Sequence, residues 1–121
     1  MNKGGESQKR QLEEALLSSG WRIAEREPIT AEWWVDEIWT IESVWRPVGF
    51  TLFLSFLVDL VYSGTRRSGE KISAITCSSI RPRTRADMMG GPLIFLRPAW
   101  EKNLPEFLAK LKELRDQATQ Q

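Results

Sequence analysis

The chain contains no histidine and a single cysteine. Without imidazole, it can build neither a Ser-His-Asp triad nor a histidine proton shuttle. One thiol, Cys77, supports neither an intramolecular disulfide nor a zinc or iron–sulfur site of the usual Cys and His ligands. The composition therefore predicts no metal and no cofactor, and it removes the commonest sites of hydrolytic and redox chemistry.

Long hydrophobic segments are also lacking. The longest apolar run, residues 50–62, is interrupted by Thr51, Ser55 and Asp59 and is too short to cross a bilayer as a helix. Residues 1–11 are polar and hold no apolar stretch of the kind found in signal peptides. Because a lone cysteine also suits a reducing compartment, these features predict a cytoplasmic protein that does not bind membranes.

Glycine and proline are not in excess, with 8 and 6 residues among 121, which excludes collagen-like and low-complexity sequences. What remains is an ordinary globular composition, 41% hydrophobic and 27% charged, in a chain of 14.0 kDa. A chain of this length suits one buried core. We therefore expect a single domain over residues 1–121, with disordered tails at 1–5 and 118–121.

Hydrophobic periodicity predicts the secondary structure. Apolar and polar residues alternate over several internal segments, and apolar residues recur at helical spacing near both ends of the chain. Gly20 suits the end of the first helix, and Asn103 with Glu106 suits the start of the last one. The predicted elements, in order, are a helix at 6–19, strands at 21–25, 32–45, 50–58, 71–80 and 92–96, and a helix at 104–117.

This order predicts an α+β fold. The expected architecture is a two-layer sandwich, in which an antiparallel sheet of four to five strands carries the N-terminal and C-terminal helices on one face. Trp21, beside the first helix, is predicted to lie in the core. The alternation in the second strand assigns five more side chains to the helix-covered face: Trp33, Val35, Trp39, Ile41 and Trp45.

The opposite face of the sheet is predicted to lack cover from its own chain. It would present aromatic and aliphatic side chains interleaved with polar ones, which is typical of surfaces that bind proteins. We take this face as a candidate surface for a protein partner or a homodimer, with anchors Trp34, Ile38, Phe53 and Leu57. Two other interpretations stay open, because antiparallel sheets are commonly half-exposed and because the loop at 81–91 is long enough to cover this face.

Basic residues are concentrated in the middle of the chain. Residues 61–100 hold 7 Lys/Arg against 2 Asp/Glu, although the net charge of the whole chain is only +1. Three arginines, Arg81, Arg83 and Arg85, share one predicted loop and suggest an alternative function, the binding of RNA or phosphate. The competing interpretation is a solvated loop that balances the acidic N-terminal half, since no nucleic-acid-binding motif accompanies these arginines.

Residues for catalysis are few. Asp36 and Glu37 are predicted to point to opposite faces of one strand, so they do not form a carboxylate pair. No base accompanies any serine, and no imidazole is present to activate Cys77. We therefore predict that the protein is not an enzyme.

Four short runs carry a resemblance: WRPVG at 45–49, LSFLVD at 54–59, GGPL at 90–93 and LPEF at 104–107. They resemble an uncharacterised group of small bacterial proteins, and the likeness spans most of the chain from Trp33 onward. This resemblance implies a bacterial cytoplasmic protein and supplies no activity or binding residues. The order of helix, sheet and helix is also similar to the secretion-chaperone-like α+β folds, whose members often dimerise and bind other proteins.

Overall fold

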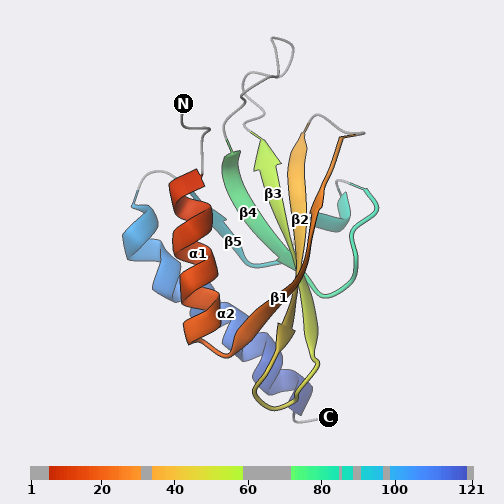
Figure 1. Cartoon of the computed structure of the whole chain (residues 1–121), viewed down its shortest axis with the longest axis vertical. Helices are drawn as coiled ribbons and strands as arrows, with labels where there is room; N and C mark the ends of the chain where they lie inside the picture. The colour runs from red at the N-terminus through yellow and green to blue at the C-terminus, as the bar shows by residue number, and fades with distance from the viewer. Residues whose placement is uncertain are drawn as a thin grey trace.

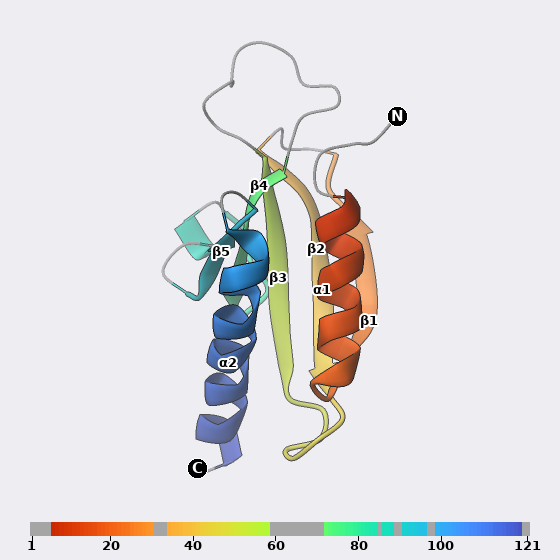
Figure 2. The same ribbon diagram turned by 90° about the vertical axis from the view of Figure 1, so that its left-hand side faces the viewer.

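The computed structural model describes residues 6–30, 34–58, 72–84, 86–88, 91–96 and 99–119. Their elements are α1 (Glu6–Ser18), β1 (Trp21–Pro28), β2 (Val35–Ser43), β3 (Thr51–Val58), β4 (Ile72–Ser78), the short 3-10 helix η2 (Ala86–Met88), β5 (Leu93–Phe95) and α2 (Trp100–Thr119). The five strands form one antiparallel sheet in the order β1-β2-β3-β4-β5, and both α-helices lie on the same face of it (Figures 1 and 2). The predicted α+β fold is confirmed.

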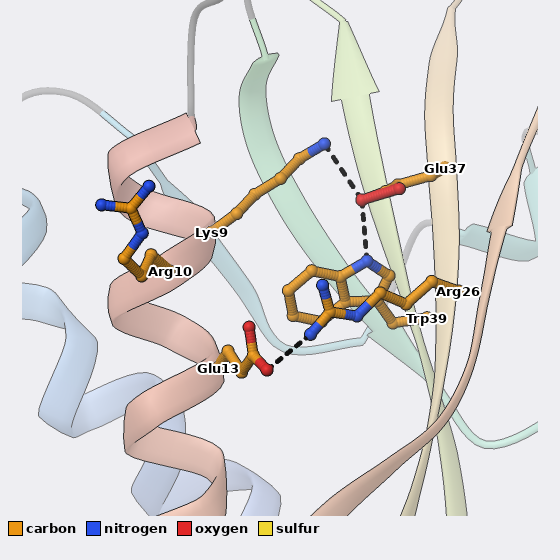
Figure 3. Close-up of a pocket in the computed structure, with 6 residues that line it drawn as sticks. All are labelled: Lys9, Arg10, Glu13, Arg26, Glu37 and Trp39. Atoms are coloured by element: carbon orange, nitrogen blue, oxygen red, sulfur yellow. Dashed lines mark hydrogen bonds and ion pairs between the residues drawn. The ribbon is translucent and has the colours of Figure 1, made fainter.

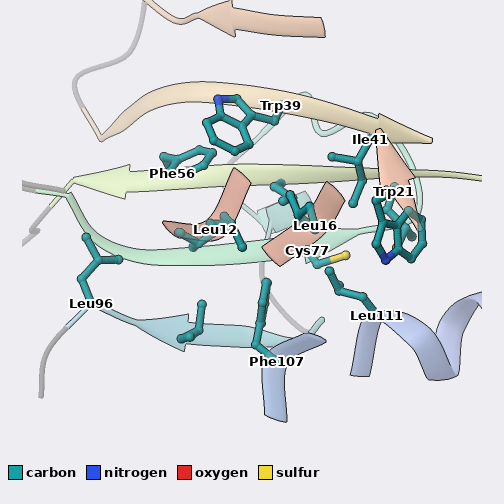
Figure 4. Packing of buried hydrophobic residues seen from close by; sticks show 14 of the residues in the cluster. Leu12, Leu16, Trp21, Trp39, Ile41, Phe56, Cys77, Leu96, Phe107 and Leu111 are labelled. Carbon is teal, nitrogen blue, oxygen red and sulfur yellow. The ribbon is translucent and has the colours of Figure 1, made fainter. Parts of the chain in front are cut away.

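The main core lies between this sheet and the two α-helices (Figure 4). Leu12 and Leu16 of α1 lie one helical turn apart and are fully buried, so α1 presents one apolar stripe to the sheet. Phe107 and Leu111 repeat the same spacing in α2. Each fully buried side chain of this size contributes about 1.5–3 kcal/mol relative to an exposed one, so these stripes fix both helices on the sheet.

The second strand departs from the predicted alternation. The register between β2 and β3 shifts between Val35 and Glu37, so one extra residue intervenes. Val35 consequently packs with Ile38 on the face away from the helices, and its predicted place beside Trp39 is wrong. Trp45 lies beyond the end of β2 and is 50% exposed, so its predicted burial in the core is wrong too. Trp33 lies outside the described residues.

The last helix begins earlier than predicted. α2 starts at Trp100, and the backbone N–H of Asn103 donates to the carbonyl of Ala99 at 3.0 Å, so Asn103 lies inside the first turn. Pro105 therefore falls within the helix, on its exposed side. α2 continues to Thr119, two residues beyond the predicted end, whereas residues 1–5 and 120–121 lie outside the described part. None of the described helices is long and apolar enough to span a membrane.

The connection between β4 and β5 carries η2 onto the face of the sheet that lies away from α1 and α2 (Figure 1). There, Met88 is buried against Val35, Ile38 and Leu57 and forms a second, smaller core. The prediction that this face is uncovered is therefore wrong at its centre, and the alternative that the 81–91 loop covers it is correct there. A connection of this length is free to cross a sheet, since it need not form a tight hairpin.

Candidate interaction surfaces

The four predicted anchors lie together, but they are not equally accessible. Ile38 and Leu57 are buried beneath Met88. Trp34 and Phe53 pack against this cluster and are half-buried. The structure thus brings the predicted residues into one group, of which only Trp34 and Phe53 retain exposed area for a partner.

The arginine loop is tied to its own chain. Arg81 forms an ion pair with Glu27 of β1. The carboxylate of Asp87 accepts hydrogen bonds from the backbone N–H groups of Arg83 and Thr84, at 2.9 and 3.2 Å. These hydrogen bonds, with that of Arg83 the largest cause, hold the pKa of Asp87 below its usual value. This turn places η2, and Met88 with it, over the sheet. Arg85 lies outside the described residues.

A polar cleft of about 290 Å³ opens between α1 and strands β1 and β2 (Figure 3). No pattern in the sequence indicates this cleft, because its residues come from elements far apart in the chain. It is lined by Lys9, Arg10, Glu13, Arg26, Glu37 and Trp39.

Ion pairs occupy most of the charged groups of this cleft. Lys9 Nζ lies 2.8 Å from Asp36 Oδ2 and 3.0 Å from Glu37 Oε1, so the bulge in β2 brings both carboxylates to one lysine. The prediction that Asp36 and Glu37 point apart is wrong for this reason. Burial opposes the charge of Lys9, but the hydrogen bonds and charges of Asp36 and Glu37 outweigh it and raise the pKa of Lys9. Trp39 Nε1 donates to Glu37 Oε1 at 2.7 Å.

An ion pair also joins α1 to β1 on the other side of the cleft. Arg26 pairs with Glu13 of α1 at 2.7 Å and lies over the ring of Trp39, 4.6 Å from its centroid. Among the described residues, Arg10 is the cation of this cleft without an ion pair, and it is exposed. Because Lys9 and Arg26 pair with carboxylates across the cleft, these ion pairs join α1 to the sheet and leave little unpaired charge for a ligand.

A second groove, of about 200 Å³, lies between β5 and α2. The buried side chains of Ile94 and Phe107 contribute apolar lining, and polar residues of α2 contribute the rest. The polar residues are Asn103, Glu106 and Lys110, which share one stripe of the helix with Phe107. Leu93 and Phe95 complete the lining from the strand.

β5 is an edge strand of the described sheet, with β4 on one side only. The N–H of Leu96 donates to Ser73 and the carbonyl of Pro92 accepts from Cys77, so alternate residues of this segment turn their backbone groups toward β4. Leu93 and Phe95 therefore turn their N–H and C=O groups away from the sheet. Their side chains are 37% and 55% exposed.

The sequence predicted this strand but not its position. Strand order is set by long-range pairing, so the alternation within 92–96 contains no sign that β5 lies at the edge. A weak signal is the shortness of the segment and the proline at its start, both of which suit edge strands. Comparisons with protein-family models, with curated proteins and with solved structures found no match for this chain.

Proposed function

We propose that the protein is a non-enzymatic protein-binding module that accepts an extended polypeptide segment as an additional strand along β5. The observation that carries this proposal is the exposed apolar edge at Leu93 and Phe95, whose outward backbone groups have no strand beside them in the described sheet. Edge strands that bind peptides in this way gain affinity from backbone hydrogen bonds and selectivity from neighbouring pockets.

The groove beside β5 has the composition of a protein interface. Ile94 and Phe107 form its apolar part, while Asn103, Glu106 and Lys110 provide polar groups around it. An apolar centre with a polar rim is the usual arrangement in complexes, because the centre loses water on binding and the rim stays hydrated. This groove therefore supports a polypeptide ligand.

The two edges of the sheet differ in a way that also favours β5. β1 carries a register shift between Ile23 and Glu25 and is rich in charged residues, and both features discourage the pairing of another strand. β5 reads Leu93-Ile94-Phe95 and has neither a charge nor a bulge. β1 thus has features that hinder a further strand from pairing with it, and β5 lacks them. This difference is expected if the edge at β5 binds a partner.

The residues that the sequence predicted as anchors could add contacts to a partner bound at β5. Trp34 and Phe53 are the accessible members of the predicted anchor group, and they lie on the same sheet face as the side chain of Leu93. A partner that extends past β5 across this face would contact them. RNA or phosphate binding stays an alternative prediction, although Arg81 is already paired with Glu27. A cytoplasmic location also stays a prediction.

The proposal can be tested by selecting random peptides of about ten residues, a length that spans a strand, on the immobilised protein. The protein is attached sparsely through an N-terminal biotin, so that copies do not meet. Phe95→Lys places a charge on the open edge, and Val48→Lys is the matched control because Val48 is 74% exposed in the β2–β3 connection. Selected peptides should bind Phe95→Lys at least about tenfold more weakly than they bind Val48→Lys or the wild type. Failure to select any peptide that distinguishes the two variants would overturn the proposal.

A further inference from the structure

The edge formed by β5 is complementary to itself. Leu93 and Phe95 both turn their backbone groups outward, and Ile94 lies midway between them. In an antiparallel pair centred on Ile94, Leu93 would face the partner's Phe95, and each such pair exchanges two backbone hydrogen bonds. We propose that the strand that docks on β5 is β5 of a second copy of this chain, related by a twofold axis at Ile94. This inference rests on the proposed function and names its partner.

The result would be a single antiparallel sheet that continues through both copies. A twofold interface uses the same surface patch on each subunit. Such a patch must therefore be complementary to a second copy of itself. The three-residue strand meets this condition, because its outward positions lie symmetrically about Ile94. The alternative of a different protein as ligand does not require this symmetry.

Side-chain chemistry favours the same arrangement. Leu93 and Phe95 are among the exposed large hydrophobic residues of the described chain. Their pairing across the axis would place an aromatic side chain next to an aliphatic one on each side, and such cross-strand pairs stabilise sheets. Two of the exposed apolar side chains would thus lose contact with water in each copy.

The charges around the groove also suit a second copy. Glu106 and Lys110 lie on the stripe of α2 that lines the groove, and they contribute one negative and one positive charge. In the described part of the chain neither residue has an ion pair, whereas Lys112 and Asp116 of the same helix pair at 2.8 Å. Because the two groove charges cancel, two copies of this surface do not repel each other, and each offers both signs to the other.

Sedimentation velocity with charge-reversal variants tests the inference on the full chain. The wild type should form dimers at about 100 µM, a concentration at which modest affinities are visible. Glu106→Lys gives each groove two positive charges and Lys110→Glu gives it two negative ones. Each variant alone should dimerise at least about tenfold more weakly than the wild type, because like charges then face each other. An equimolar mixture of the two should recover dimers.

Phe95→Lys and Val48→Lys serve here as the disrupting variant and its control. Phe95→Lys should be monomeric, and Val48→Lys should dimerise like the wild type. All four substituted side chains are exposed, and far-UV circular dichroism will show whether each variant keeps its fold. Recovery of dimers in the mixture is decisive, since a folding defect in either variant would not be repaired by mixing.

Two outcomes separate this inference from the proposed function. If the wild type stays monomeric and selected peptides still bind at β5, the second copy is excluded and the protein-binding function stands. If dimers form but neither Phe95→Lys nor the charge reversals affect them, the interface lies elsewhere and the inference is wrong. If, in addition, no selected peptide distinguishes Phe95→Lys, the proposed function fails as well.

Discussion

The guanidinium of Arg115 lies over the ring of Trp45, 4.8 Å from its centroid, and so joins the end of α2 to the connection between β2 and β3. The same guanidinium lies 4.7 Å from the ring centroid of Trp21. Gly20 completes this cluster, because a Cβ added there would lie 2.2 Å from the Trp45 ring and because residues with a side chain rarely adopt its φ of +86°. The start of β1 and the connection between β2 and β3 therefore both contact one buried side chain of α2, that of Arg115.

Replacing Arg115 by methionine should destabilise the fold by about 2–4 kcal/mol, since several interactions are lost at once. Nη1 donates to the carbonyl of Gly20 at 3.2 Å and to the hydroxyl of Ser43 at 3.3 Å, and Nη2 donates to the carbonyl of Ser19 at 3.3 Å. Methionine fills a similar volume but donates none of these hydrogen bonds, although the carbonyl of Gly20 still accepts from the N–H of Val44 and the hydroxyl of Ser43 from that of Trp45. Urea denaturation will measure the change in the free energy of unfolding.

Lys112→Met is the matched control for this prediction. Lys112 lies one turn earlier in α2 and is exposed, and its salt bridge within the described part of the chain is to Asp116. Its replacement should change the free energy of unfolding by about 0.5 kcal/mol or less, which is typical of exposed ion pairs. Similar values for the two variants would show that the buried arginine is not a major stabilising contact.

Asp87→Ala should release the η2 segment from the sheet. The carboxylate of Asp87 accepts the N–H groups of Arg83 and Thr84, and these bonds hold its pKa below the usual value. A carboxylate whose pKa is lowered by folding stabilises the folded turn at pH values above its usual pKa near 3.8. This stabilisation is lost as the pH falls through the lowered pKa. In the wild type, the protection of the Arg83 and Thr84 amides, measured relative to the intrinsic exchange rate at each pH, should therefore fall only as pH falls below this range.

In the Asp87→Ala variant, the same amides should exchange rapidly at neutral pH as well, and hydrogen–deuterium exchange read by NMR will compare the two. Asp116→Ala removes an aspartate of α2 and should leave these amides unchanged. Equal protection of Arg83 and Thr84 in wild type and Asp87→Ala would mean that packing of Met88, and not the carboxylate, fixes this turn.

The sequence predicted the layers and both helices because periodicity is a local property. It misplaced Val35 because the bulge residue breaks the alternation, so that side chains before it and after it do not follow one pattern, and nothing in the residues around Asp36 marks the bulge. It misplaced Trp45 because the alternation continues past Ser43, where the strand ends. The burial of Ile38 and Leu57 under Met88 depends on the path of an irregular segment, which only tertiary contacts determine.

Thr76→Val should stabilise the protein by about 1 kcal/mol, and Ser55→Ala should be neutral or stabilising. These residues face each other across β3 and β4, both are buried, and neither hydroxyl has a hydrogen-bond partner among the described residues. A buried hydroxyl without a partner costs free energy that a methyl group does not. Thermal and urea denaturation of each variant will measure the gain.

Ser43→Ala provides the contrast, because its hydroxyl is equally buried but donates to the carbonyl of Trp45 at 2.7 Å and accepts from the N–H of Trp45 at 3.1 Å. This variant should lose about 1–2 kcal/mol. A loss of stability in Thr76→Val comparable to that in Ser43→Ala would show that Thr76 has a partner, such as a buried water molecule, in solution.

The thiol of Cys77 should be inert in the folded protein and reactive only after unfolding. Burial raises its pKa to about 12, so at pH 8 the folded chain holds almost no thiolate that could react with Ellman's reagent.

The thiol of the unfolded chain releases its proton near pH 9, and the thiol of the folded chain keeps it until about pH 12. Between these values the unfolded state binds fewer protons, so the free energy of unfolding should fall as pH rises. Cys77→Ala lacks this dependence, and its cavity should cost about 1 kcal/mol at pH 7. The stability gap between wild type and variant should therefore narrow, and then reverse, as pH rises above 9. Rapid labelling of the native protein at pH 8, at the rate seen in 6 M guanidinium, would contradict the burial of this thiol.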